Sequence, residues 1–400
     1  MKFLSNYKKF VFKGFIGDII STLITTLTSL SLVNYLDDVL YGSYIYGVAI
    51  ALPLITLTSI SGESVILSNN NEESKKDIFY TRIRISIFIF PILFIISYFD
   101  TSNAIPWFLL TFIYFVKLQE SISRLLYSYL YLDDRIKEIN YFKISNQLLI
   151  FIGLGIISPF TQSITNGLIF TFLLRILLLV IQINGIKHYL KFDKAKLFKL
   201  HIDKKYFVLG SISFLTALNI SIPKIISQNI YGVEFMSVLG AILLVPSFVE
   251  VIFTSVNKSI RNRLSKMVDE FLNIRHFIFK VLTIFFISVL AMGITLFLFQ
   301  DYLYLFLSAR VIGNLQNILF ILFGVPLLVS SYNFYFLLIK LEEFKMLLKL
   351  QIVLTFVSFS SSYYFINQLG LEGFSINYII FALFSFFLYR NAVLRKNLYG

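Results

Sequence analysis

Eight ionisable side chains fall inside or at the edges of the long apolar stretches of this sequence. They are Asp18, Glu63, Lys117, Glu120, Arg124, Arg175, Lys224 and Glu250. A charge at mid-bilayer depth costs about 2.5 to 3.5 kcal/mol on insertion scales, so such residues face a polar cavity or one another and are candidates for function. Acids and bases are equally represented among the eight. Pairing between helices is therefore a direct alternative to a ligand site.

Three of these charges share one helical face. Lys117, Glu120 and Arg124 follow at i, i+3 and i+7, and an acid four residues before a base is the favourable order for an ion pair. One interpretation is a strip that neutralises itself. The other is a cationic lining, because the strip keeps one net positive charge. The sequence leaves both open.

The two other bases have no acid within one turn of sequence. For Arg175 and Lys224 we weigh three interpretations: contact with a ligand, an ion pair with another helix, and snorkelling of the long side chain to the membrane surface. Together with Lys117 and Arg124 they form the set of candidate substrate-binding residues.

Three acids lie toward the predicted cytoplasmic ends of their spans. Asp18, Glu63 and Glu250 are candidates for ion coupling, because a carboxylate can bind H⁺ or Na⁺ in one conformation and release it in another. The alternative is that they are hydrated residues at the membrane surface. Position in the sequence does not separate the two.

Several kinds of chemistry have no residues to perform them. There is no Gly-x-x-x-x-Gly-Lys-Ser/Thr stretch for ATP, and Gly153-Leu154-Gly155 lacks the third glycine and the strand of a nucleotide fingerprint, so we interpret it as helix packing. Cysteine is absent, and His188, His201 and His276 lie in predicted loops away from any acidic cluster. We therefore predict no catalytic residue, no metal and no cofactor.

The composition identifies the medium in which these charges lie. Hydrophobic residues make up 57% of the chain, charged residues only 14%, and the mean hydropathy is +0.80. So much apolar surface is typical of an integral membrane protein. The net charge of +13 comes from bases dispersed between apolar runs. This dispersal argues against nucleic acid as a partner.

The apolar runs predict about twelve membrane-spanning helices, since roughly 20 apolar residues cross ~30 Å of hydrocarbon. The predicted spans are 14–35, 43–67, 83–99, 105–131, 144–160, 164–186, 207–229, 236–257, 277–299, 314–339, 347–366 and 371–390. Most of the 35 Lys and Arg fall in alternate loops, which predicts that both termini are cytoplasmic. The first span reads as a retained signal anchor.

The chain divides into two halves with a related pattern. The basic connector 187–206 separates six predicted spans from six, giving lobes 1–206 and 207–400. At an offset of 193 residues, the apolar run from Gly47 to Pro53 recurs from Gly240 to Pro246. Six is even, so the lobes would be parallel copies. Two such lobes are the usual architecture of secondary transporters.

Two short motifs carry a resemblance to a known family. Asp37-Asp38-Val39-Leu40-Tyr41-Gly42-Ser43-Tyr44 follows the first span, and Leu218-Asn219-Ile220-Ser221-Ile222-Pro223-Lys224 precedes Tyr231-Gly232-Val233-Glu234. These resemble bacterial polysaccharide flippases of the O-antigen repeat-unit translocase type, in the multidrug/oligosaccharidyl-lipid/polysaccharide exporter superfamily. The family usually has arginine where this chain has Lys224. Lysine keeps the charge but lacks the bidentate fork.

The resemblance implies a fold, a substrate and a location. It implies a MATE-like pair of six-helix lobes whose spans one, two, seven and eight line a cavity, with Lys224 meeting the diphosphate of an undecaprenyl-diphosphate-linked oligosaccharide. Such a protein carries an O-antigen or capsule repeat unit between leaflets of the bacterial inner membrane by alternating access, with H⁺ or Na⁺ as the candidate coupling ion. Partners would be membrane lipids, a polysaccharide polymerase and a chain-length regulator.

Two other functions compete with this hypothesis. A drug or cation antiporter of the same fold would favour acids over bases in its cavity. A membrane polysaccharide polymerase, which is a glycosyltransferase, usually has a large periplasmic loop, whereas the longest predicted loop on that side is about 300–313. We therefore expect a transporter rather than an enzyme.

Overall fold

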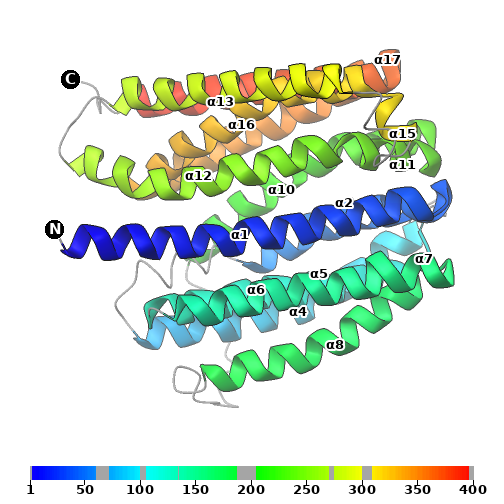
Figure 1. The fold of residues 1–400 in the computed structure, drawn as a ribbon, viewed down its shortest axis with the longest axis horizontal. Helices are drawn as coiled ribbons and strands as arrows, with labels where there is room; N and C mark the ends of the chain where they lie inside the picture. The colour runs from blue at the N-terminus through cyan, green and yellow to red at the C-terminus, as the bar shows by residue number, and fades with distance from the viewer. Residues whose placement is uncertain are drawn as a thin grey trace. The chain divides into compact units, whose positions relative to one another are not determined.

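The computed structural model describes residues 2–59, 72–99, 105–133, 135–186, 204–269, 274–299 and 309–395, and in these ranges every regular element is helical (Figure 1). The chain forms two compact units, Met1–Ser221 and Ile222–Gly400. The boundary between the units lies inside helix α10 (Lys204–Tyr231). The division into six-span lobes at 206/207 stays a prediction.

The N-terminal unit is a bundle of long helices. They are α1 (Lys2–Tyr35), α2 (Asp38–Ser59), α4 (Glu72–Phe99), α5 (Trp107–Leu132), α6 (Ile136–Ile150), the π-helix η1 (Phe151–Ile157), α7 (Ser158–Thr161) and α8 (Ile164–Gly185), followed by the start of α10. Helix α5 packs against α2 and α8, and α1 packs against α6 and η1. These contacts bring α1, α5, α6 and α8 together around the polar residues described below.

The C-terminal unit is built around helix α16. Its helices are the end of α10, α11 (Val233–Ile242), α12 (Leu244–Asp269), α13 (Ile274–Leu298), α15 (Ala309–Ile312), α16 (Leu315–Lys340) and α17 (Phe344–Leu394). Helix α16 packs against α12, α13 and α17. Helix α17 is two helices that meet at Gly370, whose φ of 56° suits glycine best. It therefore supplies both of the last two predicted spans.

The helices confirm a multi-pass membrane protein. Eight of them, or nine when the bent pair α11 and α12 is one span, are long and apolar enough to cross a membrane among the residues described. Each of the twelve predicted spans overlaps helix in its described residues, although the predicted ends differ. Helix α5 is absent from the eight because Lys117, Glu120 and Arg124 lie near its middle. The side on which the termini lie stays a prediction.

Prolines shape the helices in two ways. Pro53, Pro91 and Pro223 lie inside helices, where each removes one backbone hydrogen bond. Pro246 instead occupies the first turn of α12, where its missing N–H costs nothing, and the chain bends by 45° between α11 and α12 just before it. The bend in this span therefore lies ahead of the proline.

Two glycines let the π-helix η1 touch α8. A Cβ placed on Gly153 would fall 2.6 Å from the Gly167 carbonyl oxygen, and one on Gly167 would be still closer to the Gly153 carbonyl. The obstacle is backbone on both sides, so it cannot rotate away. The packing interpretation of Gly153-Leu154-Gly155 is confirmed for Gly153.

We expect Gly167→Ala to lower the thermal stability of the purified protein. Alanine favours helix, but here its methyl group must push η1 from α8, and overpacking of this kind costs about 1 to 3 kcal/mol. Gly185→Ala is the matched control, because a Cβ there meets nothing nearer than 3.8 Å. Thermal unfolding in detergent measures both. Equal melting temperatures for the two variants would contradict the close helix contact.

Candidate functional site

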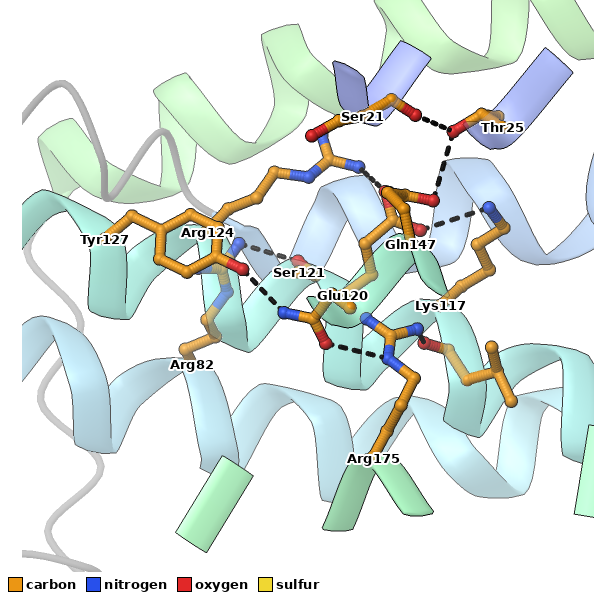
Figure 2. Close-up of polar contacts among 12 residues, drawn as sticks. Ser21, Thr25, Arg82, Lys117, Glu120, Ser121, Arg124, Tyr127, Gln147 and Arg175 are labelled. Atoms are coloured by element: carbon orange, nitrogen blue, oxygen red, sulfur yellow. Dashed lines mark hydrogen bonds and ion pairs between the residues drawn. The ribbon is translucent and has the colours of Figure 1, made fainter. Parts of the chain in front are cut away.

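The predicted strip on α5 is a three-residue ion-pair network. Glu120 Oε2 accepts from Lys117 Nζ at 3.1 Å, and Glu120 Oε1 accepts from Arg124 Nη2 at 2.6 Å (Figure 2). The shared helical face is confirmed. The Arg124 side chain is 57% exposed and the Lys117 side chain is 29% exposed. The strip keeps one net positive charge and two accessible cations.

This exposure restricts what the strip can face. Helix α5 coincides with the predicted span 105–131, and hydrocarbon does not accommodate an exposed lysine and arginine near the middle of a span. The strip must therefore meet water, a ligand or other protein. Tyr44 of α2 interacts electrostatically with Lys117 and Glu120, so α2 belongs to the same polar face.

Arg175 is buried and ties three helices together. Only 1% exposed, it lies on α8 and donates from Nε to Asn146 Oδ1 of α6 at 3.1 Å and from Nη1 to the Val116 carbonyl of α5 at 3.0 Å. Asn146 Nδ2 in turn donates to Tyr127 Oη at 2.6 Å (Figure 2). Snorkelling is therefore wrong for Arg175.

One nitrogen of this arginine remains available. Arg175 Nη2 is buried and has no hydrogen-bond partner among the described residues. A buried donor of this kind costs free energy unless water or a ligand satisfies it. Glu120 interacts with Arg175 electrostatically, which links the buried guanidinium to the accessible strip. The structural and ligand-binding interpretations of Arg175 are thus compatible.

Asp18 has a partner that the sequence did not suggest. Its Oδ1 accepts from Lys143 Nζ of α6 at 2.9 Å, and both side chains are mostly buried. Further along the same two helices, Thr25 Oγ1 of α1 donates to Gln147 Oε1 of α6 at 3.1 Å (Figure 2). Polar contacts therefore run along the interface of α1 and α6.

In the C-terminal unit, Lys224 and Glu250 belong to one cluster. Both are half-buried, on α10 and α12, and they interact electrostatically. Tyr332 Oη of α16 donates to Glu250 Oε1 at 3.2 Å. Tyr378 of α17 interacts with the same carboxylate, and its ring occupies the space over Gly324, where a Cβ would fall 2.8 Å from it. Lys224, predicted to bind substrate, and Glu250, predicted to bind a coupling ion, thus lie in one cluster.

The sequence analysis missed two of the polar residues, and one residue that it predicted lies outside the described residues. Glu63 is not among the described residues. Arg82, which donates to Ser121 Oγ at 2.7 Å, and Lys143 were assigned to loops because the spans were predicted to begin at 83 and 144. The helices begin earlier, at Glu72 and Ile136, so both bases lie well inside them. In the sequence, the adjacent amide side chains of Asn146 and Gln147 could have indicated that this helix makes polar contacts.

Comparison with known proteins places the fold. No protein-family model and no curated protein sequence matches the chain. Among solved structures, it is similar to the inward-facing conformation of a multidrug resistance MATE family transporter of the MOP superfamily, with a TM-score of 0.65 and 14% identity over 94% of this chain and 96% of the other. It is also similar to a mutant of the Vibrio cholerae MATE transporter VcmN, with a TM-score of 0.64 and 15% identity over 100% of both chains.

A third similar structure differs in its description. It is a MOP superfamily transporter from Pyrococcus furiosus, described by a reverse polarity of its binding pocket that suggests a different function, with a TM-score of 0.59 and 14% identity over 98% of this chain and 97% of the other. At these identities the comparisons show the fold alone. The chain has the fold of MATE transporters of the MOP superfamily, as the MATE-like prediction requires.

Proposed function

We propose that this chain is a transporter, not an enzyme, and that it moves an undecaprenyl-diphosphate-linked oligosaccharide between membrane leaflets. The observation that carries the proposal is the excess of cations in the N-terminal unit. Along α1, α5, α6 and α8, away from the turn between α5 and α6 where Arg135 pairs with Asp133 and Glu138, the polar contacts contain four bases against two carboxylates. The bases are Lys117, Arg124, Lys143 and Arg175, and the carboxylates are Asp18 and Glu120. An anionic substrate fits this balance better than a cationic one.

The headgroup of such a lipid contains two kinds of polar group, sugars and a diphosphate, that must cross the membrane. Sugars and a diphosphate do not cross hydrocarbon unaided, because their polar groups lose hydration. Lysine and arginine offset this loss with charge-assisted hydrogen bonds to phosphate, each worth about 1.5 to 3 kcal/mol. Amide and hydroxyl groups such as Gln147 and Thr25 are the matching partners for sugar hydroxyls. The N-terminal unit holds both kinds of group.

The two units suit alternating access. In transporters built from two lobes, a central substrate site is exposed first to one side of the membrane and then to the other. We propose movement from the cytoplasmic to the periplasmic leaflet of a bacterial inner membrane. The delivered repeat unit would then pass to a polysaccharide polymerase and a chain-length regulator.

A drug or cation antiporter is the second candidate function. It is favoured by the multidrug MATE transporters among the similar structures and by two carboxylates at membrane depth, Asp18 and Glu250. Against it stands the pairing of both acids with basic or phenolic side chains. The Pyrococcus furiosus structure, with its reversed pocket polarity, supports the idea that this fold accepts other substrates.

A reconstitution experiment separates the two functions. In proteoliposomes containing the full chain, we expect a fluorescent undecaprenyl-diphosphate trisaccharide to equilibrate between leaflets at least tenfold faster than in empty liposomes, read by a membrane-impermeant quencher. The same lipid bearing a monophosphate and no sugar is the control for scrambling. Export of the cationic dye ethidium without movement of the trisaccharide lipid would instead establish the antiporter.

A further inference from the structure

The ammonium of Lys143 lies between a carboxylate and a phenol oxygen. Lys143 Nζ lies 2.9 Å from Asp18 Oδ1 and 3.4 Å from Tyr131 Oη, at the hydroxyl end of the Tyr131 ring. Both oxygens attract a cation. The ammonium thus occupies a position that an inorganic cation would otherwise find favourable.

The two helices pack closely beside this position. Next to Asp18, a Cβ on Gly17 would fall 2.6 Å from Cγ of Asn140, so α1 and α6 are in close contact here and a larger residue at position 17 would require the Asn140 side chain to move. Asn140 and Lys143 are three residues apart on α6 and share a face. The close contact between Gly17 and Asn140 therefore lies beside the pair that Asp18 forms with Lys143.

The ion pair leaves Asp18 with little affinity for a second cation. Two like charges about 4 Å apart repel strongly enough, at the effective dielectric constant near a protein surface, to lower an affinity by roughly a hundredfold or more. An added Na⁺ would meet the Lys143 ammonium at about this distance. Helix α1 therefore carries a carboxylate whose cation is supplied by the protein.

We infer that Lys143 is a tethered counter-cation: its ammonium fills the place of a coupling Na⁺ at Asp18, and an arriving diphosphate exchanges it away from Asp18. The second part rests on the proposed function, since it needs an anionic headgroup. A diphosphate bears more charge than one carboxylate and is the stronger competitor for the ammonium. Both side chains of the pair remain partly accessible, with exposed fractions of 17% for Lys143 and 19% for Asp18. Substrate binding would then itself loosen α1 from α6.

The first part is tested by cation-dependent stability, which needs no substrate. The full-length purified protein is unfolded thermally in NaCl and in N-methylglucamine chloride at equal ionic strength. We expect no Na⁺-specific shift of the wild-type protein, a Na⁺-specific rise of several degrees for Lys143→Met, and loss of that rise in Lys143→Met with Asp18→Asn. If Lys143→Met does not fold, Lys143→Gln replaces it.

Two results would overturn the first part. One is a Na⁺-specific stabilisation of the wild-type protein that Asp18→Asn removes, because Asp18 would then already bind the ion. The other is a folded Lys143 variant that gains no response to Na⁺.

The second part is tested with inorganic pyrophosphate as the probe. We expect Asp18→Asn to bind pyrophosphate about tenfold more tightly than wild type, because the competing carboxylate is gone, and Lys143→Met to bind it about tenfold more weakly. Unchanged binding in both variants, in a protein that moves the trisaccharide lipid, would overturn the exchange and leave the proposed function intact. Absence of both pyrophosphate binding and lipid movement would instead reject the proposed function and the exchange together, without affecting the Na⁺ result.

Discussion

The triple variant Lys117→Met, Glu120→Gln, Arg124→Gln is expected to stay folded and to lose at least a hundredfold in transport of the trisaccharide lipid. The three side chains pair with one another and are partly exposed, so removing them together strands none of the three. The buried Arg175 loses its electrostatic interaction with Glu120 but keeps its hydrogen bonds to Asn146 and to the Val116 carbonyl. Two charge-assisted bonds to a diphosphate are worth about 3 to 6 kcal/mol together, which is more than a hundredfold in affinity. Leaflet exchange in proteoliposomes, normalised to protein amount, measures the loss.

The single variant Glu120→Gln is the matched control for the strip. It frees Lys117 and Arg124 from their shared acid, so a cationic substrate-binding strip should work at least as well as in the wild-type protein. A self-neutralising strip predicts the opposite pattern: the single variant would disturb the helix, and the triple variant would transport normally. Normal transport by the triple variant would thus remove this face of α5 from the substrate site.

Local spacing explains what the sequence could predict. Helical periodicity alone fixes the geometry of Lys117, Glu120 and Arg124, because all three lie within two turns of one helix. The structure reproduces that strip with both ion pairs. Apolar run lengths likewise located helix in the described part of every predicted span, since hydrocarbon thickness sets the length of a span.

Contacts between distant helices explain what the sequence could not predict. Arg175 bonds to Asn146 and to the Val116 carbonyl, which lie 29 and 59 residues away, and nothing in its own helix indicates either partner. The Asp18 and Lys143 pair spans 125 residues. Lys143 was also excluded from the predicted span because a charged residue was taken to end a span. A lysine that is paired with an acid is tolerated inside a span.

Lys224 is expected to be required for transport, with arginine as the one substitution that retains it. The resemblance to polysaccharide flippases implies that Lys224 meets the diphosphate. Lys224→Ala removes this positive charge, and Lys224→Arg keeps it. We expect at least a tenfold loss for alanine, because one charge-assisted bond to phosphate is worth about 1.5 to 3 kcal/mol. Lys349→Ala, at an exposed lysine of α17, is the control for loss of one charge from the same unit.

The neighbouring acid allows a stability effect to be separated from a binding effect. Lys224→Ala leaves Glu250 with Tyr332 as its hydrogen-bond donor, and loss of the positive charge that interacts with this half-buried carboxylate is destabilising. Adding Glu250→Gln removes the stranded charge, so the double variant should recover protein abundance and thermal stability. If it recovers transport as well, Lys224 serves only to neutralise Glu250. If it recovers abundance but stays inactive, while Lys224→Arg transports, the charge at position 224 acts on the substrate.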